Sequence, residues 1–565
     1  MKKTNNKAAI PVILVLAACF ASVLFCIHQG IETTANGNAK KTTLTNQQII
    51  KNLGVKSVSK TANDKLTKKY RQILKQKQYS FSKPYIKVNP YQTSPLTALM
   101  IFHTKEEAAK VSYKVKGKTT GTTISNTVKG YQTNHQVPIV GLYANTTNDV
   151  EVTLTYKSGK KVTKHFKLKT GKLPKWITSS KVKVTKNDKS KMQLGNNELT
   201  VLNRTTKQTF AVDADGQVRW YYSRWNEHMF KQLNNGHIVL LNKIKNSDYR
   251  YNLLVETDYL GRVYRQFSFD KTLGGSYAGT AGLSVVHHDL IELPNGNWLM
   301  TVSDGSKYVE DSVAELNTKT GKIVKVIDFK KIFPASMYKQ SKIKAADSAT
   351  KGLGLLDWLH INSLSYDEKT NSLLVSSRNQ DMIWSINYKT NKLNWIYSSK
   401  AKASWPKSMR KYILTRQAGT QYTCGQHALT LLSSTGSTQR VLLYDNNIAV
   451  TNGNKKTSGK YSQAVEYEID TVKHTIKQVW SYGKSLGKQN FTLIIGNAQR
   501  LSNGNTLIDF GYRQNGKSSN IIEVTSQGEQ VFNLVLPAND NNKTYAYRAY
   551  RLQFFPSNYV FDLNR

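Results

Sequence analysis

Cysteine is scarce in this sequence, and its scarcity excludes two kinds of protein. Only three of the 565 residues are cysteines, and two of these lie within the first 30 residues, so Cys424 stands alone in the rest of the chain. A disulfide framework and a cysteine-based metal site are therefore excluded there. Cys424 is either a small buried residue or an oxidisable thiol, and we favour the first interpretation.

Acidic residues are also few, which leaves a large excess of positive charge. Asp and Glu total 36 against 81 Lys and Arg, a formal net charge of +45. Such a charge suggests nucleic acid as a partner. The lysines, however, are scattered through turns, as at Lys389 and Lys392, and no zinc-finger, helix-turn-helix or RRM signature occurs. We predict no nucleic-acid partner and a solvated basic surface, suited to an anionic cell envelope or to anionic substrates.

The sequence also has few segments with the apolar periodicity of a helix. Runs rich in Val, Ile and Thr outnumber them, and tyrosine (31) and tryptophan (9) are plentiful. This composition predicts an all-β protein. Hydrophobic residues make up 39% of the chain, which excludes wholesale disorder, and the length indicates two or three domains.

The N-terminus predicts export. Lys2, Lys3 and Lys7 precede an uncharged, largely apolar stretch over residues 8–27, which is long for a secretory signal and just long enough to span a bilayer. Residues 16–19 resemble a lipobox that would place a lipid on Cys19, but the apolar run continues past it. We predict a signal peptide or membrane anchor over residues 1–30, ahead of lipidation, and an extracytoplasmic protein at the cell surface or anchored to the membrane.

Three further segments differ in pattern. Residues 31–83 are polar and predict a spacer with one helix near 64–77. Residues 84–175 contain short alternating strands, such as Val111–Val115, joined by Gly, Asn and Thr turns, which is typical of a β-sandwich. Residues 176–565 form a longer repeating region, which we predict to be the catalytic domain.

The repeating region contains a polar turn followed by a strand with Val or Ile and often an aromatic residue. Six copies occur at irregular spacings. A Leu-x-Asn-Gly-x turn occurs three times between them and precedes an apolar strand, as in Asn-Gly hairpins. Six such units predict a six-bladed β-propeller, with a solenoid as the alternative, and the strand Tyr550–Phe555 is expected to pair near Leu199–Asn203 and close the ring. The copies begin at Asp215, Leu260, Thr320, Thr390, Lys473 and Gln527, and the Asn-Gly turns at Leu233, Leu293 and Leu501.

Histidines recur where the inner strands are expected to begin. His228 and His288 each lie five residues before a turn leucine, and His360 and His427 each open a strand. A single histidine is more often a hydrogen-bonded structural residue. Four in one register are expected to converge on the propeller axis and form a site. Three imidazoles also suffice for zinc, so a metal site is the alternative, although only Asp289 and Asp357 stand near them in the sequence to support it.

An arginine is expected at the same end of one unit. Ser376-Ser377-Arg378 ends the strand that follows the one opened by His360, which indicates a hairpin that returns the arginine to the histidine. A guanidinium presents paired donors to a tetrahedral oxyanion, so Arg378 favours a sulfate or phosphate group as the ligand.

Together, these motifs resemble those of the bacterial arylsulfate sulfotransferases. The resemblance extends from about Pro84 to the end of the chain, and it depends on the joint order of the motifs more than on any one of them. The similar segments of the repeating region are Asp357–Ser363, Ser376–Arg378, His287–Asp289, Gly425–His427 and Gln499–Ile508. Those of the N-terminal module are Asn89–Tyr91, Ser94–Leu99 and Val137–Tyr143.

The resemblance implies a β-sandwich followed by a six-bladed propeller, often as a homodimer, that transfers a sulfuryl group from an aryl sulfate to a phenol. Neither PAPS nor another cofactor takes part, and no metal is expected. The family nucleophile, a histidine that becomes sulfated in a ping-pong reaction, corresponds to His427. The supporting histidines correspond to His288 and His360, and the sulfate-binding arginine corresponds to Arg378.

The implied chemistry is physically reasonable. Sulfuryl transfer, like phosphoryl transfer, is in-line and depends largely on positioning and electrostatics, and a neutral imidazole is available near neutral pH to attack sulfur. One supporting histidine would help Arg378 to stabilise the sulfuryl oxygens, and the other would exchange the phenol proton; the sequence leaves open which does which. His287 is an alternative to His288, His228 is a further candidate, and Asn362 is a weaker candidate for a substrate contact.

Two other functions are compatible with the same features. A metal-independent sulfatase or phosphatase would transfer to water, and a non-catalytic envelope propeller would bind anionic polymer through its basic surface. The sequence lacks a Gly-x4-Gly-Lys-Ser/Thr loop, as expected of an enzyme that needs no nucleotide. The predicted partners are small phenolic sulfate donors, phenol acceptors and, at the N-terminus, a membrane.

Overall fold

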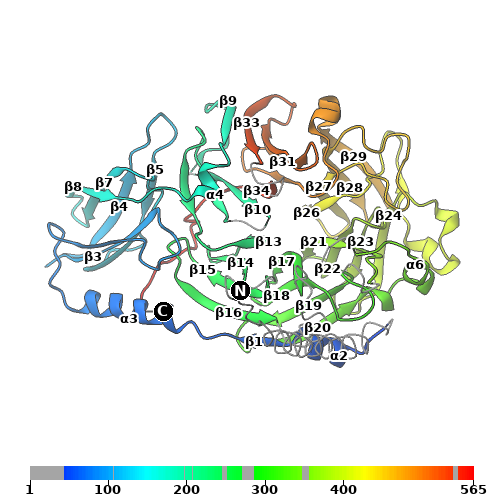
Figure 1. Ribbon diagram of the computed structural model, residues 1–565, viewed down its shortest axis with the longest axis horizontal. Helices are drawn as coiled ribbons and strands as arrows, with labels where there is room; N and C mark the ends of the chain where they lie inside the picture. The colour runs from blue at the N-terminus through cyan, green and yellow to red at the C-terminus, as the bar shows by residue number, and fades with distance from the viewer. Residues whose placement is uncertain are drawn as a thin grey trace, which may run out of the picture.

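The computed structural model describes residues 43–105, 107–195, 198–205, 208–244, 251–269, 285–345, 355–538 and 545–564. These residues form a small β-sandwich beside a larger ring of sheets, as Figure 1 shows at the left and right of the view. The leader or anchor predicted over residues 1–30, with Cys19, lies outside them. Within the described ranges, the helices are too short or too polar to cross a bilayer.

The β-sandwich follows from the alternating pattern of its strands. In β4, Ala109, Val111, Tyr113 and Val115 are buried, whereas Lys114 between them is exposed. One sheet has the order β2-β3-β6 and the other β5-β4-β7-β8, and their buried faces share one core. The strands are β2 (Tyr85–Val88), β3 (Thr97–His103), β4 (Ala109–Val115), β5 (Ile124–Thr127), β6 (Asn134–Val140), β7 (Thr147–Tyr156) and β8 (Lys161–Lys169).

The ring is a six-bladed β-propeller over the described residues, and each blade is an antiparallel sheet that begins with an inner strand. Blade 1 is β34 (Ala546–Leu552), β10 (Leu199–Arg204), β11 (Phe210–Val212) and β12 (Val218–Tyr221). Blade 2 is β13 (Asn226–Gln232), β14 (Ile238–Asn242), β15 (Leu253–Thr257) and β16 (Val263–Phe269). Blade 3 is β17 (Val286–Glu292), β18 (Trp298–Val302), β19 (Ser312–Asn317) and β20 (Lys322–Asp328).

The remaining blades have the same order. Blade 4 is β21 (Ile361–Asp367), β22 (Ser372–Ser377), β23 (Met382–Asn387) and β24 (Leu393–Ser398). Blade 5 is β26 (His427–Ser434), β27 (Thr438–Asp445), β28 (Gln463–Asp470) and β29 (Thr475–Tyr482), with β25 (Thr415–Arg416) at its edge. Blade 6 is β30 (Asn497–Arg500), β31 (Thr506–Arg513), β32 (Ser518–Val524) and β33 (Gln530–Pro537). Short helices lie at α4 (Lys175–Thr178) and α6 (Ala335–Lys339), and 3-10 turns at Phe329–Lys331, Lys402–Ser404, Lys407–Tyr412 and Lys484–Asn490.

The sequence repeats fall at equivalent places in the blades. Each copy of the polar turn lies between the third and fourth strands of a blade, and each Asn-Gly turn joins the first strand to the second. Gly236, Gly296 and Gly504 in the Asn-Gly turns have φ of 81°, 78° and 90°, a region that a residue with a side chain rarely adopts. The propeller prediction is confirmed, and the solenoid alternative is wrong.

Both ends of the propeller region close the ring. The C-terminal strand β34 pairs antiparallel with β10, with Leu552 opposite Leu199 and Tyr550 opposite Val201, which confirms the predicted pairing although β34 begins earlier and ends at Leu552. At the other end, β9 (Lys183–Asn187) adds to the outer edge of blade 6 by pairing with β33. Blades 1 and 6 are therefore each completed by a strand that is distant in the sequence.

Side-chain amides join the inner strands of blades 6 and 1, which belong to different sheets. Asn497 donates from Nδ2 to the Ala549 carbonyl and accepts at Oδ1 from the Ala549 N–H, both at 2.8 Å. Gln499 does the same to Arg551 at 3.0 and 2.7 Å. These two amides take the place of a strand ladder between β30 and β34.

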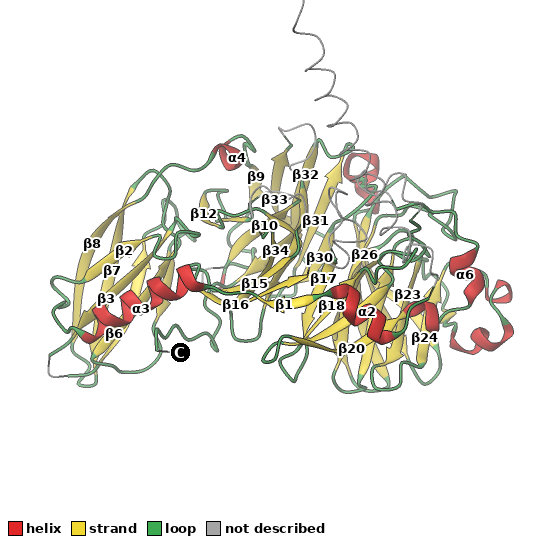
Figure 2. Cartoon of the chain, turned by 60° about the horizontal axis from the view of Figure 1, so that its bottom comes forward, coloured by secondary structure: helices red, strands yellow, loops and turns green. Residues whose placement is uncertain are grey.

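The expected polar spacer, residues 31–83, differs from the structure in its described part. Helix α2 (Asn46–Leu53) begins at a capping box of Thr45 and Gln48 and buries Ile49 and Leu53 against blades 2 and 3. Strand β1 (Val55–Ser57) then pairs with β16, and helix α3 (Thr61–Lys75) packs against the sandwich. Figure 2 shows this segment running along one side of the molecule. Its few apolar residues lie on one face of each helix, so a polar composition conceals two docked helices.

A buried arginine joins the sandwich to the propeller. Arg219 of β12 donates from Nε to the Gly141 carbonyl at 2.9 Å and from Nη1 to the Thr122 carbonyl at 2.6 Å. Asp213 balances its charge at 3.0 Å, and both side chains are almost completely buried. A paired and hydrogen-bonded charge of this kind fixes the sandwich against blade 1.

Replacing Asn497 is expected to weaken ring closure. Asn497→Leu leaves the buried N–H and C=O of Ala549 without their partners, at about 1–3 kcal/mol for each group, so the free energy of unfolding should fall by roughly 2–6 kcal/mol. Urea unfolding followed by tryptophan fluorescence measures the change, with Gln72→Leu at an exposed position of α3 as the control. Equal midpoints for Asn497→Leu and the control would contradict this role for the amide.

Candidate active site at the propeller axis

Three histidines in the left-handed region stand at or near the start of an inner strand. His228, His288 and His360 have φ of 51°, 41° and 54°. The ladder shifts register around His228 and His288, and in blade 4 it shifts just after His360, between Ile361 and Ser363. A residue in this conformation at a β-bulge leaves the alternation of the strand, so its side chain points in a new direction. Histidine tolerates the left-handed region better than most residues.

The bulges bring the four predicted histidines together around the axis. The ring centroids of His228 and His288 are 5.3 Å apart, those of His288 and His360 are 4.7 Å apart, and those of His360 and His427 are 6.5 Å apart. All four imidazoles are therefore neighbours in one cluster, although they come from blades 2 to 5. The predicted convergence of these histidines on the axis is confirmed.

The common register predicted for the four histidines is off by one residue at His427. In blade 5 the left-handed residue is Ala428, with φ of 56°, and the ladder shifts register between His427 and Thr430. His427 therefore corresponds in backbone position to His287, which precedes the left-handed His288. The turn alignment placed only His228 and His288, and His427 was placed by its strand start alone, since blade 5 has no Leu-x-Asn-Gly turn between its first two strands.

The hydrogen bonds of His427 determine which of its nitrogens is protonated. Nδ1 lies 2.7 Å from Asn446 Oδ1 and 3.1 Å from the Gly425 carbonyl oxygen. The Asn446 Nδ2 donates to the carbonyls of Thr492 and Ile495 at 3.2 and 2.9 Å, so the amide oxygen faces the imidazole. Two acceptors at Nδ1 require a proton there, which leaves the lone pair of a neutral imidazole on Nε2.

The charge state of His427 agrees with this tautomer. Burial, followed by the positive charges of Arg378 and His360, holds the pKa of His427 well below its usual value. Its side chain is only slightly exposed, so the charged form loses most of its hydration. His427 is therefore a neutral imidazole with an unprotonated Nε2.

His360 is in the opposite electrostatic situation. Its Nδ1 lies 2.6 Å from Asp357 Oδ2 and 2.7 Å from Glu310 Oε2. Burial by itself would lower the pKa of His360, but the two carboxylates outweigh burial and raise it to about 10. His360 is therefore an imidazolium at neutral pH, beside a neutral His427.

The other histidines of the cluster are neutral. Burial lowers the pKa of His228 and of His287 to about 4, and it lowers the pKa of His288 well below the usual value. His287 and His288 approach each other through their Nδ1 atoms at 2.8 Å. The ring of His288 is the one that contacts both His228 and His360, and this places it nearer the centre of the cluster than His287.

Arg378 brings unused donors to the cluster. It follows β22 directly, its backbone N–H donates to the His360 carbonyl at 3.1 Å, and its Nη1 donates to Asn379 at 2.8 Å. Among the described residues, its buried Nε has no hydrogen-bond partner, and the same holds for His228 Nδ1 and the Tyr547 hydroxyl. Buried polar atoms without partners are costly, so their concentration here suits a polar ligand.

Asn362 lies beside the cluster, but its side-chain N–H and its backbone carbonyl are hydrogen-bonded to other residues of the protein. Its Nδ2 donates to the Gln426 carbonyl at 2.8 Å, directly before His427, and its own carbonyl accepts from Arg548 Nη2 at 2.7 Å. In this position Asn362 joins blade 4 to the strand that carries His427. Its predicted contact with substrate stays a prediction.

Histidine and carboxylate groups with spacing suitable for a metal occur here, but their contacts fit protons better. The described residues offer the sets His287, His288, Glu310 and Glu310, Asp357, His360. The contacts of 2.6–2.8 Å within them are hydrogen-bond distances. Two ligands of a tetrahedral zinc ion with bonds of about 2.0–2.1 Å stand roughly 3.3 Å apart. A third set, Asp304, Asp311 and Asp328, surrounds the Lys330 ammonium at 2.8–3.0 Å.

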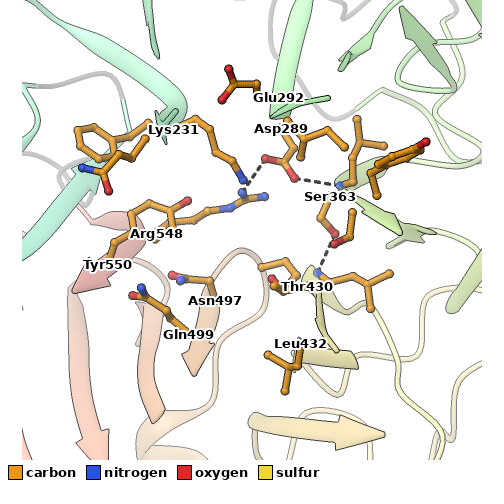
Figure 3. A pocket seen from close by; sticks show the side chains of 18 of the residues that line it. Lys231, Asp289, Glu292, Ser363, Thr430, Leu432, Asn497, Gln499, Arg548 and Tyr550 are labelled. Carbon is orange, nitrogen blue, oxygen red and sulfur yellow. Dashed lines mark hydrogen bonds and ion pairs between the residues drawn. The ribbon is translucent and has the colours of Figure 1, made fainter. Parts of the chain in front are cut away.

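A second space lies on the axis at the other ends of the inner strands. Figure 3 shows this cavity of about 600 Å³, with Lys231, Asn497 and Tyr550 around it. Arg548 pairs with Asp289 at 3.2 Å in its wall. None of the four clustered histidines lines the cavity, so the Arg548–Asp289 pair separates it from the site described above.

Sequence reasoning missed two site residues, Glu310 and Asn446. Asn446 follows β27 of blade 5 as Arg378 follows β22 of blade 4, so the hairpin argument made for Arg378 would have found it in the next blade. Glu310 lies in the connection between β18 and β19, where no repeat or strand pattern marks it. Only the contact with His360 reveals its place.

Cys424 is buried, as expected for a small structural residue. It is 2% exposed, and its N–H donates to Asp445 at 2.9 Å. Burial raises the pKa of its thiol well above the usual value, so the reactive thiolate is disfavoured.

Fold and site together define a β-propeller protein with a buried histidine–arginine–carboxylate centre on its axis. Residues 181–548 match the family model described as Arylsulfotransferase (ASST), and residues 85–171 match the Arylsulfotransferase Ig-like domain. The chain belongs to the arylsulfotransferase family.

The curated relatives and solved structures named here share at most 25% sequence identity with the chain. The arylsulfate sulfotransferase AssT of Escherichia coli is 25% identical over 353 residues, which are 54% of this chain and 57% of that protein. AssT of Lelliottia amnigena is 22% identical over 517 residues, 75% of this chain and 84% of its own length. A putative 6-phosphogluconolactonase from Bacteroides uniformis has a TM-score of 0.33 at 9% identity, over 79% of this chain and all of that one. The β-propeller domain of Cps50 has a TM-score of 0.31 at 11% identity, over 63% of this chain and 86% of that one.

The tautomer of His427 is open to direct measurement. In ¹⁵N-histidine-labelled protein, long-range ¹H–¹⁵N spectra should show a protonated Nδ1 and an unprotonated Nε2 for His427, and acidification below the usual histidine pKa should leave it neutral. Asn446→Ala removes the closer acceptor and should introduce the Nε2–H tautomer, whereas Asn454→Ala at an exposed turn should not. A protonated Nε2 in the wild type would contradict the assignment.

Proposed function

We propose that this protein transfers a sulfuryl group from an aryl sulfate to a phenol by way of a sulfated His427. The observation that carries the proposal is the fixed tautomer of this residue. Asn446 and Gly425 accept from its Nδ1–H, and Nε2 keeps its lone pair. A nucleophilic imidazole needs exactly this unprotonated nitrogen at neutral pH. Family membership and the names of the curated relatives support the same activity.

The first half-reaction sulfates the enzyme. The Nε2 lone pair of His427 attacks sulfur, and the bond between sulfur and the aryl oxygen breaks on the opposite side, as in-line transfer requires. The imidazolium of His360 gives its proton to the departing phenolate, so that a neutral phenol leaves. The products are a phenol, a neutral His360 and an N-sulfo-His427.

The second half-reaction reverses the roles. An acceptor phenol loses its proton to the neutral His360, and its oxygen attacks sulfur while the bond between sulfur and Nε2 breaks. His427 is again a neutral imidazole and His360 again an imidazolium. Because proton and sulfuryl group both return to their starting points, the cycle uses no cofactor.

The sulfuryl oxygens would be held by Arg378 and His288. Arg378 offers its buried Nε, and His288 is a neutral imidazole that can donate one N–H. Such preorganised donors in a water-excluded site stabilise charge that develops in the transition state. This arrangement assigns the proton exchange to His360 and the oxygen contacts to Arg378 and His288.

The location and assembly of the enzyme extend the same proposal. The basic, apolar N-terminal segment supports export, with the propeller outside the cytoplasm and association with the membrane through residues 1–30. The homodimer is proposed on the family resemblance alone.

Enzyme assays with 4-nitrophenyl sulfate distinguish transfer from its alternatives. The wild type should turn over nitrophenyl sulfate continuously only when an acceptor phenol is present, with or without a chelator, and should give parallel double-reciprocal plots. Without an acceptor, release should stop after about one equivalent per enzyme, when His427 is sulfated. His427→Asn should lose at least about 10³-fold in turnover, and Arg378→Lys about 10²–10³-fold, because each removes a group acting on the transferred sulfuryl. His165→Asn, on the exposed face of β8, is the control. Continued turnover without acceptor indicates a hydrolase, and no release from any aryl sulfate indicates a binding protein.

The opposite charges of the two histidines predict the pH dependence of the first half-reaction. His427 must be neutral and His360 charged, so the rate constant should stay level on acidification through the ordinary histidine pKa. It should fall on the alkaline side as pH approaches the raised pKa of His360, about 10. Stopped-flow release of phenol from phenyl sulfate at varied pH measures this, because that leaving group needs the proton of His360. A decline through the usual histidine pKa would contradict the assigned charge states.

A further inference from the structure

Glu310 has a strained backbone and a position between two site histidines. Its φ of 56° lies in the left-handed region, which is costly for a residue with a side chain. Its carbonyl accepts from the Ile361 N–H at 3.0 Å, directly after His360, so the connection in blade 3 is attached to the first residue of β21. Its Oε2 lies 2.7 Å from His360 Nδ1 and 3.8 Å from His288 Nδ1.

We propose that Glu310 is a positioning residue that, together with Asp357, keeps His360 charged and oriented as the proton donor to the departing phenolate. The inference depends on the function proposed above, because it gives His360 a proton to deliver. One Nδ1–H forms one strong hydrogen bond, which Asp357 Oδ2 accepts at 2.6 Å. The second carboxylate then acts mainly through its negative charge and leaves Nε2–H as the proton that can be transferred.

The groups around His360 show why it has two carboxylates to keep it protonated. Asp357 and Glu310 favour the imidazolium. Arg378 lies in the same blade as His360, and the imidazoles of His288 and His427 face it from the neighbouring blades. His228 and His287 stand farther away in the same cluster. Burial raises the pKa of Asp357, while the pKa of Glu310 is held well below its usual value because the positive charge of His360 outweighs burial. Glu310 is therefore the more acidic of the two carboxylates.

A buried ion cluster holds Glu310 and His360 in place. Asp311, the next residue after Glu310, lies 2.8 Å from the Lys330 ammonium, which also contacts Asp304 at 2.9 Å. The Trp358 indole donates to Asp311 at 2.7 Å, two residues before His360. The Asp311 side chain thus anchors both segments that carry the Glu310–His360 contact. This preorganises the pair across blades 3 and 4.

Donors with different leaving groups test the role of Glu310. Glu310→Gln keeps the shape but removes the charge, so sulfation of His427 by phenyl sulfate, whose phenolate needs a proton, should slow by about 10²-fold. Sulfation by 4-nitrophenyl sulfate, with its weakly basic leaving group, should slow by less than about 10-fold. Glu310→Asp should recover part of the loss, and Glu529→Gln on the surface should behave as the wild type. Equal slowing with both donors would show a merely structural role and overturn the proposal.

A second readout does not require sulfuryl transfer. In ¹⁵N-histidine spectra, with His360→Gln used to assign the signal, His360 of the wild type should remain charged well above the usual histidine pKa. Glu310→Gln should shift this titration to lower pH, whereas Glu529→Gln should not. If Glu310→Gln does not fold, Glu310→Asp, which retracts the carboxylate, should give a smaller shift in the same direction.

The two readouts separate the possible failures. If the wild type transfers no sulfuryl group but His360 titrates as described, the proposed function is wrong and the charge effect of Glu310 holds. If the wild type is active but His360 titrates alike in the wild type and in Glu310→Gln, the role of Glu310 is wrong and the proposed function stands.

Discussion

The site depends on hydrogen bonds that tie the inner strands to one another around the axis. Neighbouring inner strands belong to different sheets, so no backbone ladder joins them, and polar side chains make the connection instead. Most of these bonds satisfy a buried backbone group that would otherwise be costly. They are Asn203 Nδ2 to His228 O, Asn234 N to Glu292, Leu364 N to Asp289, Asn362 Nδ2 to Gln426 O, Asn446 Nδ2 to Ile495 O, and the Asn497 amide to Ala549. Arg548 adds a bond across the axis from blade 1 to the Asn362 carbonyl.

Several of these connecting bonds end at residues next to the catalytic candidates. The hydrogen bonds that close the ring therefore also fix the geometry of the site. Asn362 holds the carbonyl directly before His427, and Asn203 holds the carbonyl of His228 itself. The bulges at the strand starts then turn the imidazoles toward one another. A propeller with a loosened ring would keep its blades but lose the spacing of the histidines.

Two imidazoles whose ring centroids are 6.5 Å apart differ in charge because their partners differ. His427 meets an amide oxygen and a carbonyl, which fix a tautomer without adding charge. His360 meets two carboxylates, which overcome burial and keep it protonated. Environments that push the pKa values of neighbouring groups apart are how one site supplies a nucleophile and an acid at the same pH.

The sequence by itself determined the all-β class, the β-sandwich, the blades with their turns, and the histidines at the strand starts. These features are local, because alternation and Asn-Gly turns act over a few residues. Only the tertiary structure decided the charge states, the offset of His427 and the places of Glu310 and Asn446. It also showed that a segment expected as a spacer is docked through Ile49 and Leu53. The reason is distance along the chain: Arg548 meets Asp289 across 259 positions, and a pKa depends on such neighbours, which no local pattern encodes.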